Sequence, residues 1–220
     1  MSNAIVAGFM ILGAYALGSI PWGFIIGRFY GVDVRTVGSK NIGATNVTRT
    51  VGKLPGKLCF ILDFLKGGLP VLAAQYVTAS MNCSSAWLVI AVMFAAILGH
   101  IFPVFLSFKG GKGVSTAAGA IMALAPWPLL VAFAVWTVVF FVFRYVSLAS
   151  ICAAAVLPVT AWVFKLCNIG SPVARAPLTL LFLTIIAVLA IARHHSNIKR
   201  LLNGTESRFG KDKKAENAGK

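Results

Sequence analysis

The sequence predicts an all-α integral membrane protein with seven membrane-spanning helices. Apolar residues make up 59% of the 220 residues and charged residues only 11%, and the mean hydropathy is +0.87. A soluble domain is typically about 45–50% apolar and about 25% charged. The apolar residues also form long blocks, which is the pattern of helices that cross a bilayer.

Seven apolar blocks follow one another along the chain. The expected spans are 5–29, 58–77, 87–105, 114–125, 129–143, 148–164 and 178–192. In the first block, Pro21 and its neighbouring glycines are tolerated if adjacent helices satisfy the backbone groups that they free. The block has no basic segment before it, so we interpret it as a retained span and not as a cleaved signal peptide.

The basic residues predict the orientation, because cytoplasmic loops of membrane proteins are rich in Lys and Arg. With seven crossings, only Lys165 and Arg175 fall on one side, and Lys66 lies inside the second span. All other Lys and Arg residues fall on the opposite side, so we expect the N-terminus outside and the C-terminus in the cytoplasm. The net charge of +15 then reflects membrane topology and does not indicate nucleic-acid binding.

We expect a single domain over residues 1–207, followed by a basic tail. Residues 208–220 are charged and lack apolar periodicity, which is typical of a disordered segment. The chain has four cysteines, Cys59, Cys83, Cys152 and Cys167. They show no metal-ligand spacing, so we expect small buried hydrophobic residues and no bound metal.

The first of three polar clusters, residues 38–49, lies between the first two expected spans. It is dense in hydroxyl and amide side chains and has no acidic residue, which suits an anionic ligand. Its candidate phosphate contacts are Ser39, Asn41, Thr45, Asn46 and Arg49. Hydroxyl groups can donate to phosphate oxygens, and an arginine can bind a phosphate through two parallel hydrogen bonds. The alternative is a solvated loop whose Asn and Ser side chains form turns.

The second cluster is the glycine-lysine loop, residues 108–113, between the third and fourth expected spans. Its candidate phosphate contacts are Lys109, Gly110, Gly111, Lys112 and Gly113. Glycines let the backbone turn tightly, and lysines with free N–H groups ahead of a helix suit a phosphate. The spacing is not that of a Walker A loop. Alone, the loop fits a flexible basic turn at the lipid headgroups slightly better than a phosphate site, but the other two clusters reverse this balance.

Three ionisable residues near these loops fall inside the expected spans. Asp63 and Lys66 are three residues apart on one helix face, and we interpret them as an internal ion pair that supports the bundle. Lys66 is also a candidate neighbour of the anion site. His100, about two turns before the glycine-lysine loop, is a functional candidate and equally well a helix-packing residue.

The third cluster, residues 193–206, follows the last expected span. If that span continues as a helix, His194 and Asn197 share a face, while His195 points to solvent or lipid. The alternative, and the better account of the Lys and Arg residues here, is a basic segment that binds anionic lipid. Glu206, the only acid in the cluster, is expected to pair structurally with basic residues.

All three clusters fall on the same expected side of the membrane, and all are rich in donors for oxyanions. Such loops at one end of a helical bundle form a phosphate site beside the acyl chains of the bilayer. This placement indicates chemistry that joins a phosphorylated headgroup to a fatty chain.

The clusters resemble the three signature motifs of the bacterial acyl-phosphate:glycerol-3-phosphate acyltransferase family. These motifs are G-S-x-N-x-G-A-T-N-x-x-R at 38–49, G-H-x-F-P-V-F-x-x-F-K-G-G-K-G-V at 99–114 and R-H-x-x-N-I-x-R-L-x-x-G-x-E at 193–206. One departure is Lys40, where glycine is usual after the serine. The resemblance implies seven spans, an external N-terminus and a cytoplasmic active site at the bacterial inner membrane, in agreement with the charge distribution.

The resemblance implies transfer of an acyl group from acyl phosphate to the sn-1 hydroxyl of glycerol 3-phosphate. The products are lysophosphatidic acid and inorganic phosphate, and no cofactor is implied. A single chain is expected to be active, and the enzyme that makes acyl phosphate is a candidate partner.

The resemblance also implies roles for individual residues. Ser39 and Arg49, with one of the loop lysines, contact phosphate, the loop glycines cradle it, and Glu206 holds the tail against the loops. His194 and Asn197 position glycerol phosphate and its hydroxyl. Either His194 or the substrate's own phosphate takes the hydroxyl proton. No nucleophilic triad is evident, so we expect direct transfer without an acyl-enzyme.

Two other classes of function are compatible with parts of the sequence. A transporter of organic phosphates would need polar residues along the outward half of the bundle, which are few, and the spans show no clear inverted repeat. A non-catalytic scaffold that docks acidic partners would depend on the basic tail.

Overall fold

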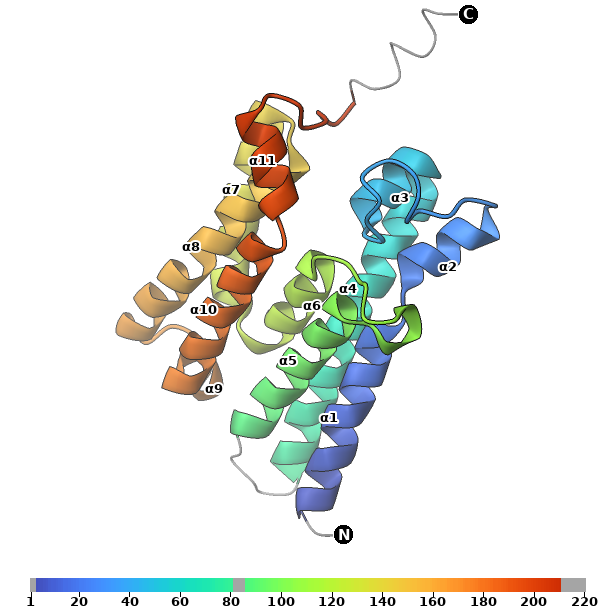
Figure 1. Cartoon of the computed structure of the whole chain (residues 1–220). Coiled ribbons are helices and arrows are strands. Elements are labelled where there is room, and N and C mark those ends of the chain that lie inside the picture. The colour runs from blue at the N-terminus through green and yellow to red at the C-terminus, as the bar shows by residue number, and fades with distance from the viewer. Residues whose placement is uncertain (1–2, 81–85, 211–220) are drawn as a thin grey trace, which may run out of the picture. The chain divides into compact units, whose positions relative to one another are not determined.

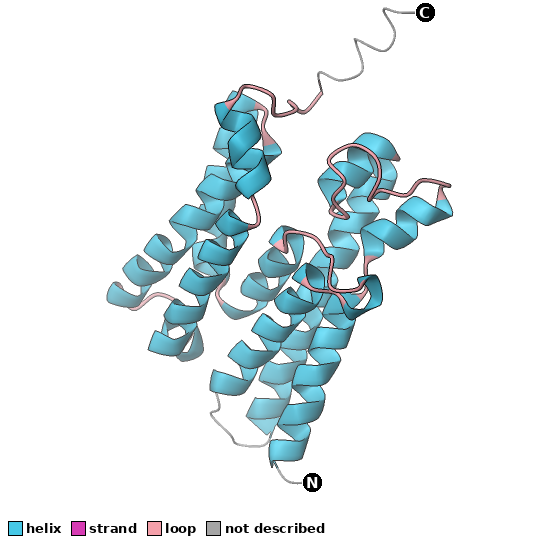
Figure 2. Ribbon diagram, viewed as in Figure 1, coloured by secondary structure: helices cyan, strands magenta, loops and turns pink. Residues whose placement is uncertain are grey.

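Helices form the regular structure of this chain in a computed structural model that describes residues 3–80 and 86–210 (Figures 1 and 2). The elements in order are α1 Asn3–Ser19, α2 Trp22–Phe29, α3 Ala44–Thr50, α4 Lys53–Ser80, α5 Ala86–Ile101, η1 Val104–Leu106, α6 Val114–Leu124, α7 Pro126–Phe143, α8 Val146–Leu166, α9 Pro172–Arg175, α10 Pro177–Ala192 and α11 His195–Leu202. Within the described ranges no strand is present.

The all-helical membrane architecture is confirmed by length and composition. Five helical segments are long and apolar enough to cross a membrane, and α10 with α11 makes a sixth if this bent pair counts as one span. The remaining apolar helix, α6, has 11 residues. Each expected span after the first corresponds to a helix, and most of the helix ends agree with the expected ones to within a few residues; the second extends further at its N-terminal end, to Lys53.

The first expected span is broken at Ile20 and Pro21, between α1 and α2. Proline lacks an N–H group and disfavours helical geometry in the residue before it. The Ile20 N–H therefore closes the end of α1 on the Leu17 carbonyl at 3.2 Å. At the break, the Ile20 carbonyl accepts from the Trp22 N–H at 3.1 Å.

The helices group into two compact units, residues 1–126 and 127–220. In the first unit, α4 packs against α1, α5 and α6, and α5 also packs along α1 (Figure 1). Most side chains of α5 are buried, so this helix forms the centre of the unit. The close approach of α4 to α6 requires Gly67 and Gly119, because a Cβ on either would overlap backbone atoms of the other helix.

In the second unit, α8 packs against α10, with α9 at one end of the pair and α11 at the other (Figure 1). The Trp136 indole of α7 donates to the Ser150 hydroxyl of α8 at 3.2 Å and stacks on Phe140. Many of the other apolar side chains of α7 are exposed, as expected where lipid replaces water as the solvent.

The expectation for the cysteines needs revision. Of the three cysteines in the described part, only Cys59 is buried; Cys152 is half-buried and Cys167, at the C-terminal end of α8, is exposed, while Cys83 lies outside the described residues. The described residues that follow Glu206 also make contacts with the second unit. The Phe209 N–H donates to the Arg144 carbonyl at 2.8 Å; residues 211–220 lie outside the description.

Candidate active site

Asn46 organises the first polar cluster. Its side chain is almost completely buried, and its Nδ2 donates to the carbonyl oxygens of Val34, Val37 and Asn41 at 2.8, 3.2 and 2.9 Å. Its Oδ1 accepts from the Ser39 N–H at 2.8 Å. Both the nitrogen and the oxygen of the Asn46 amide are thus hydrogen-bonded to backbone groups. In this geometry Asn46 shapes the loop that presents Ser39, whereas the sequence suggested a direct substrate contact.

The turn around Ser39 also explains the usual glycine at position 40. Gly38 has a φ of +60° and Lys40 a φ of +56°, both in the left-handed region. A residue with a Cβ is disfavoured there, and glycine is not. Lys40 therefore holds a strained backbone conformation beside an exposed Ser39.

Residues 44–50 form α3, although the sequence suggested an irregular loop. The Asn41 Oδ1 accepts from the Gly43 N–H at 2.9 Å and so fixes the chain just before this helix. Thr45 and Arg49 are four residues apart on α3, which places them on one face. The local signal for this helix was weak, because Thr and Asn disfavour helix interiors.

The first two clusters come together in the first unit through a shared apolar core. Ile42 and Val47 of the first cluster pack with Val34, which precedes it, and with Cys59 of α4, and Leu106 from the segment before the glycine-lysine loop packs against them. This core places the first cluster next to the segment that leads into the glycine-lysine loop.

The glycine-lysine loop is bonded to the end of α5. The Gly110 N–H donates to the Ile101 carbonyl at 3.2 Å, and the Gly111 N–H donates to the His100 carbonyl at 3.1 Å. These two N–H groups therefore point to α5, and the expected row of free donors is shorter than the sequence indicated. Gly113, with a φ of +80°, directly precedes α6, whose first-turn N–H groups have no partner within the helix.

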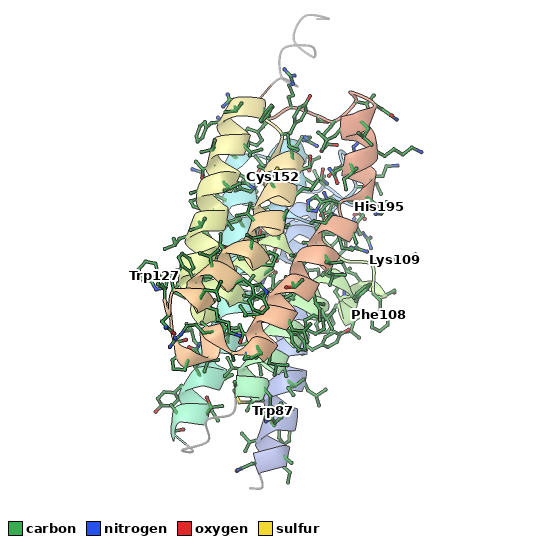
Figure 3. All side chains as sticks on the ribbon, turned by 90° about the vertical axis from the view of Figure 1, so that its left-hand side faces the viewer. Trp87, Phe108, Lys109, Trp127, Cys152 and His195 are labelled. Carbon is green, nitrogen blue, oxygen red and sulfur yellow. The ribbon has the colours of Figure 1, made fainter. Side chains whose placement is uncertain are left out.

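The two lysines of this loop differ in exposure. Lys109 and the neighbouring Phe108 are exposed and stand out from the loop (Figure 3), whereas Lys112 is half-buried. Phe108 has a φ of +61°, which is unusual for a bulky residue. The difference in exposure makes Lys112 the better candidate for a fixed anion contact.

The third cluster lies in the second unit, at a 53° bend between α10 and α11. The last span does not continue as a straight helix, because at its end the His194 N–H donates to the Ile191 carbonyl, three residues back, at 2.9 Å. His194 and Asn197 are nevertheless both buried, and His195 is exposed (Figure 3).

A hydrogen bond fixes the orientation of the His194 ring. Its Nδ1 lies 2.7 Å from the Ala190 carbonyl oxygen, which can only accept, so Nδ1 carries a proton. In the neutral ring, Nε2 is then the nitrogen with the lone pair. His194 thus has the tautomer that a proton acceptor needs.

Glu206 joins three side chains of the second unit. Its Oε1 accepts from Asn197 Nδ2 and from the Ser147 hydroxyl, and its Oε2 accepts from Arg200 Nε, each at 2.7 Å. Burial by itself would raise the pKa of Glu206, but these hydrogen bonds outweigh it and hold the pKa below its usual value. The expected pairing with a basic residue is present. The sequence had not indicated Ser147, which belongs to none of the three motifs.

An ion pair borders the first cluster on its N-terminal side. The Arg35 guanidinium bonds to both carboxylate oxygens of Asp33, at 3.0 and 2.8 Å, and lies over the Phe24 ring. Hydrogen bonds from Arg35 lower the pKa of Asp33 to about 2. Asp33 therefore remains charged and paired at any physiological pH.

The remaining predicted support residues, Asp63 and Lys66, form the expected ion pair, 2.9 Å between Lys66 Nζ and Asp63 Oδ1. Among residues 3–80 and 86–210, no three His, Cys, Asp or Glu side chains gather where they could hold a metal ion.

The whole architecture can be compared with known proteins. Residues 8–204 match the family described as Glycerol-3-phosphate acyltransferase. A glycerol-3-phosphate acyltransferase of Trichlorobacter lovleyi is 49% identical over 91% of this chain and 96% of its own length. A glycerol-3-phosphate acyltransferase of Aquifex aeolicus is 48% identical over 91% of this chain and 98% of its own length.

Two solved structures are also similar to this chain. The crystal structure of PlsY, an integral membrane glycerol 3-phosphate acyltransferase, in its glycerol 3-phosphate form matches with a TM-score of 0.82 and 45% identity. Its lysophosphatidic acid form matches with a TM-score of 0.79 and 44% identity. Each match covers 93% of this chain and 96% of the other.

Proposed function

Because the chain belongs to the glycerol-3-phosphate acyltransferase family, we propose that it transfers a fatty acyl group from acyl phosphate to the sn-1 hydroxyl of glycerol 3-phosphate. The products are lysophosphatidic acid and inorganic phosphate. The observation that carries this proposal is the similarity, over nearly the whole chain, to PlsY in forms named for glycerol 3-phosphate and for lysophosphatidic acid. The acyl-phosphate donor rests on the three sequence motifs.

The proposed chemistry is a direct transfer. The glycerol hydroxyl oxygen attacks the acyl carbonyl carbon, and the bond from that carbon to the phosphate oxygen breaks. Phosphate is a good leaving group, so the protein's main tasks are alignment and neutralisation of charge. Arg49, Ser39 and Lys112 are the proposed phosphate contacts. Asn197, oriented by Glu206, is proposed to position the glycerol moiety.

Two acceptors compete for the hydroxyl proton. The Nε2 of His194 is suited to this role because Nδ1 is occupied by the Ala190 carbonyl. The leaving phosphate is the alternative acceptor, with His194 then holding the substrate in place. A His194→Gln variant that keeps more than a tenth of the parent rate would favour the phosphate, since general acid–base catalysis typically contributes about 10²–10⁴-fold.

We also propose seven crossings of the bacterial inner membrane, with the N-terminus outside and the motifs in the cytoplasm. In this topology α6 and the α10–α11 pair cross in addition to the five long segments. The distribution of Lys and Arg supports this orientation. We expect one chain to be the active unit, and the enzyme that produces acyl phosphate to be a partner.

The test is a comparison of acyl donors with purified protein in detergent. Palmitoyl phosphate, palmitoyl-CoA and palmitoyl-acyl carrier protein are each supplied with labelled glycerol 3-phosphate, and lysophosphatidic acid is measured. We expect product with palmitoyl phosphate only. Product with either thioester, and none with palmitoyl phosphate, would reject the donor.

A further inference from the structure

Three ionisable side chains form a buried cluster inside the first unit. Asp63 and Lys66 lie one turn apart on α4, and His100 lies at the end of α5; all three are buried. The Asp63 Oδ1 is 2.9 Å from Lys66 Nζ and 3.5 Å from His100 Nδ1. One carboxylate oxygen therefore faces two potential cations.

The cluster extends to the break between α1 and α2. Lys66 Nζ also donates to the Ile20 carbonyl at 2.6 Å, and the Trp22 N–H donates to the same oxygen at 3.1 Å. A cation at this point also complements the negative end of the α1 dipole. Through Lys66, Asp63 is thus linked to the end of the first helix.

On its other side the cluster touches the glycine-lysine loop. The His100 carbonyl accepts from the Gly111 N–H at 3.1 Å, and the His100 ring lies against the same glycine. A Cβ at Gly111 would overlap the ring at Nε2, and a Cβ at Gly110 would overlap the His100 carbonyl oxygen and Pro103. The glycines at 110 and 111 are therefore required by the packing of the loop on His100, whatever ligand the loop binds.

Bundle stability alone does not account for this cluster. Replacing a buried ion pair by apolar residues of similar volume is often neutral or stabilising, and ionisable groups inside a membrane are rare outside functional sites. The cluster lies where three segments meet directly behind a proposed substrate loop. This placement gives the charges a task that apolar side chains would not perform, which is to fix the ring that supports the loop.

We propose that Asp63 orients His100, and that His100 is a positioning residue that holds the glycine-lysine loop in its substrate-binding conformation. Lys66 balances the carboxylate and ties it to the end of α1. This inference rests on the proposed function, in which that loop contacts a substrate phosphate.

The test compares the parent with His100→Leu and His100→Asn, whose amide nitrogen can take the place of the His100 Nδ1 that faces Asp63 at 3.5 Å. The control is Gln75→Leu, which removes an α4–α6 hydrogen bond from Gln75 Nε2 to the Ala123 carbonyl at 3.0 Å and makes no contact with the loop. KM and kcat for both phosphate substrates, melting temperature and hydrogen exchange of residues 108–113 are measured for each.

We expect His100→Leu to raise KM for at least one substrate by roughly tenfold to a hundredfold, since a loop misplaced by about 1 Å can cost that much. His100→Asn should recover most of this loss, and loop exchange should increase only in His100→Leu. The proposal is overturned if His100→Leu loses activity only in proportion to its fall in melting temperature, as Gln75→Leu does, and hydrogen exchange of residues 108–113 is unchanged.

A second measurement covers variants that fold poorly. Gly111→Ala is introduced into the parent and into His100→Ala, and the fold-loss in rate is compared. Removal of the ring should make Gly111→Ala much less damaging; equal losses in both backgrounds would contradict the proposed contact. If the parent shows no acyl transfer at all, the proposed function fails. Hydrogen exchange of the loop in His100→Leu still tests whether His100 holds the loop in place.

Discussion

Asn46→Asp exchanges a single NH₂ group for oxygen and tests how the first cluster is built. The Nδ2 donates to the Val34 and Asn41 carbonyls at 2.8 and 2.9 Å and, over a longer distance of 3.2 Å, to the Val37 carbonyl; in the variant an acceptor faces all three oxygens. Each buried carbonyl that loses its donor costs about 1–3 kcal/mol. The variant should therefore lose roughly 2–6 kcal/mol of stability, a large part of the 5–15 kcal/mol typical of a folded protein.

The assay is thermal melting in detergent, with activity measured below the transition. About 1 kcal/mol shifts the melting temperature of a chain of this size by roughly 2–4 °C, so a decrease of at least about 4 °C is expected. The matched control is Asn41→Asp, because Asn41 uses its side-chain oxygen as an acceptor from Gly43 and aspartate keeps that oxygen. If Asn46→Asp melts with the parent but loses activity, Asn46 is a substrate contact and our structural account of it is wrong.

Three further predictions concern other residues of the first and third clusters. Lys40→Gly should raise the free energy of unfolding by up to about 1 kcal/mol, and with it the melting temperature, because relief of the left-handed strain exceeds the entropy cost of glycine. The control Lys57→Gly, inside α4, should lower the free energy of unfolding by about 1 kcal/mol. Glu206→Gln should cost about 1–3 kcal/mol near pH 7, where Arg200 loses its carboxylate partner. Because the folded pKa of Glu206 lies below its ordinary 4.5, this difference in melting temperature should persist above pH 4.5 and vanish as the pH falls through the folded value; a constant difference down to pH 3 would contradict it. Arg49→Ala and Asn197→Ala should each reduce turnover at least about a hundredfold while the protein remains folded, as judged by melting; near-normal rates would remove these residues from the site.

Much of the helical layout could be predicted from the sequence, because long apolar blocks allow few other structures in a bilayer. The sequence also indicated the Asp63–Lys66 pair, since a spacing of three residues on a helix places the two groups side by side. What it missed depends on contacts between distant segments. The helix α3 is held by Val47 in a core with Cys59 and Leu106, and no local pattern shows this.

The details of the candidate site were harder to predict for the same reason. A motif shows that Asn46 belongs to the first cluster, but only the backbone around it reveals four hydrogen bonds and hence a loop-shaping role. The left-handed backbone at Lys40 could be suspected from the usual glycine there, which is a conformational signal. No comparable signal pointed to Ser147 as a partner of Glu206.

The dependence of phosphate release on the acceptor tests direct acyl transfer most directly. Purified protein is mixed with palmitoyl phosphate, with or without glycerol 3-phosphate, and free phosphate and lysophosphatidic acid are followed together in the first turnover. We predict that neither product forms without glycerol 3-phosphate, and that with it both appear in equal amounts. A burst of phosphate in the absence of glycerol 3-phosphate would contradict direct transfer and indicate an acyl-enzyme.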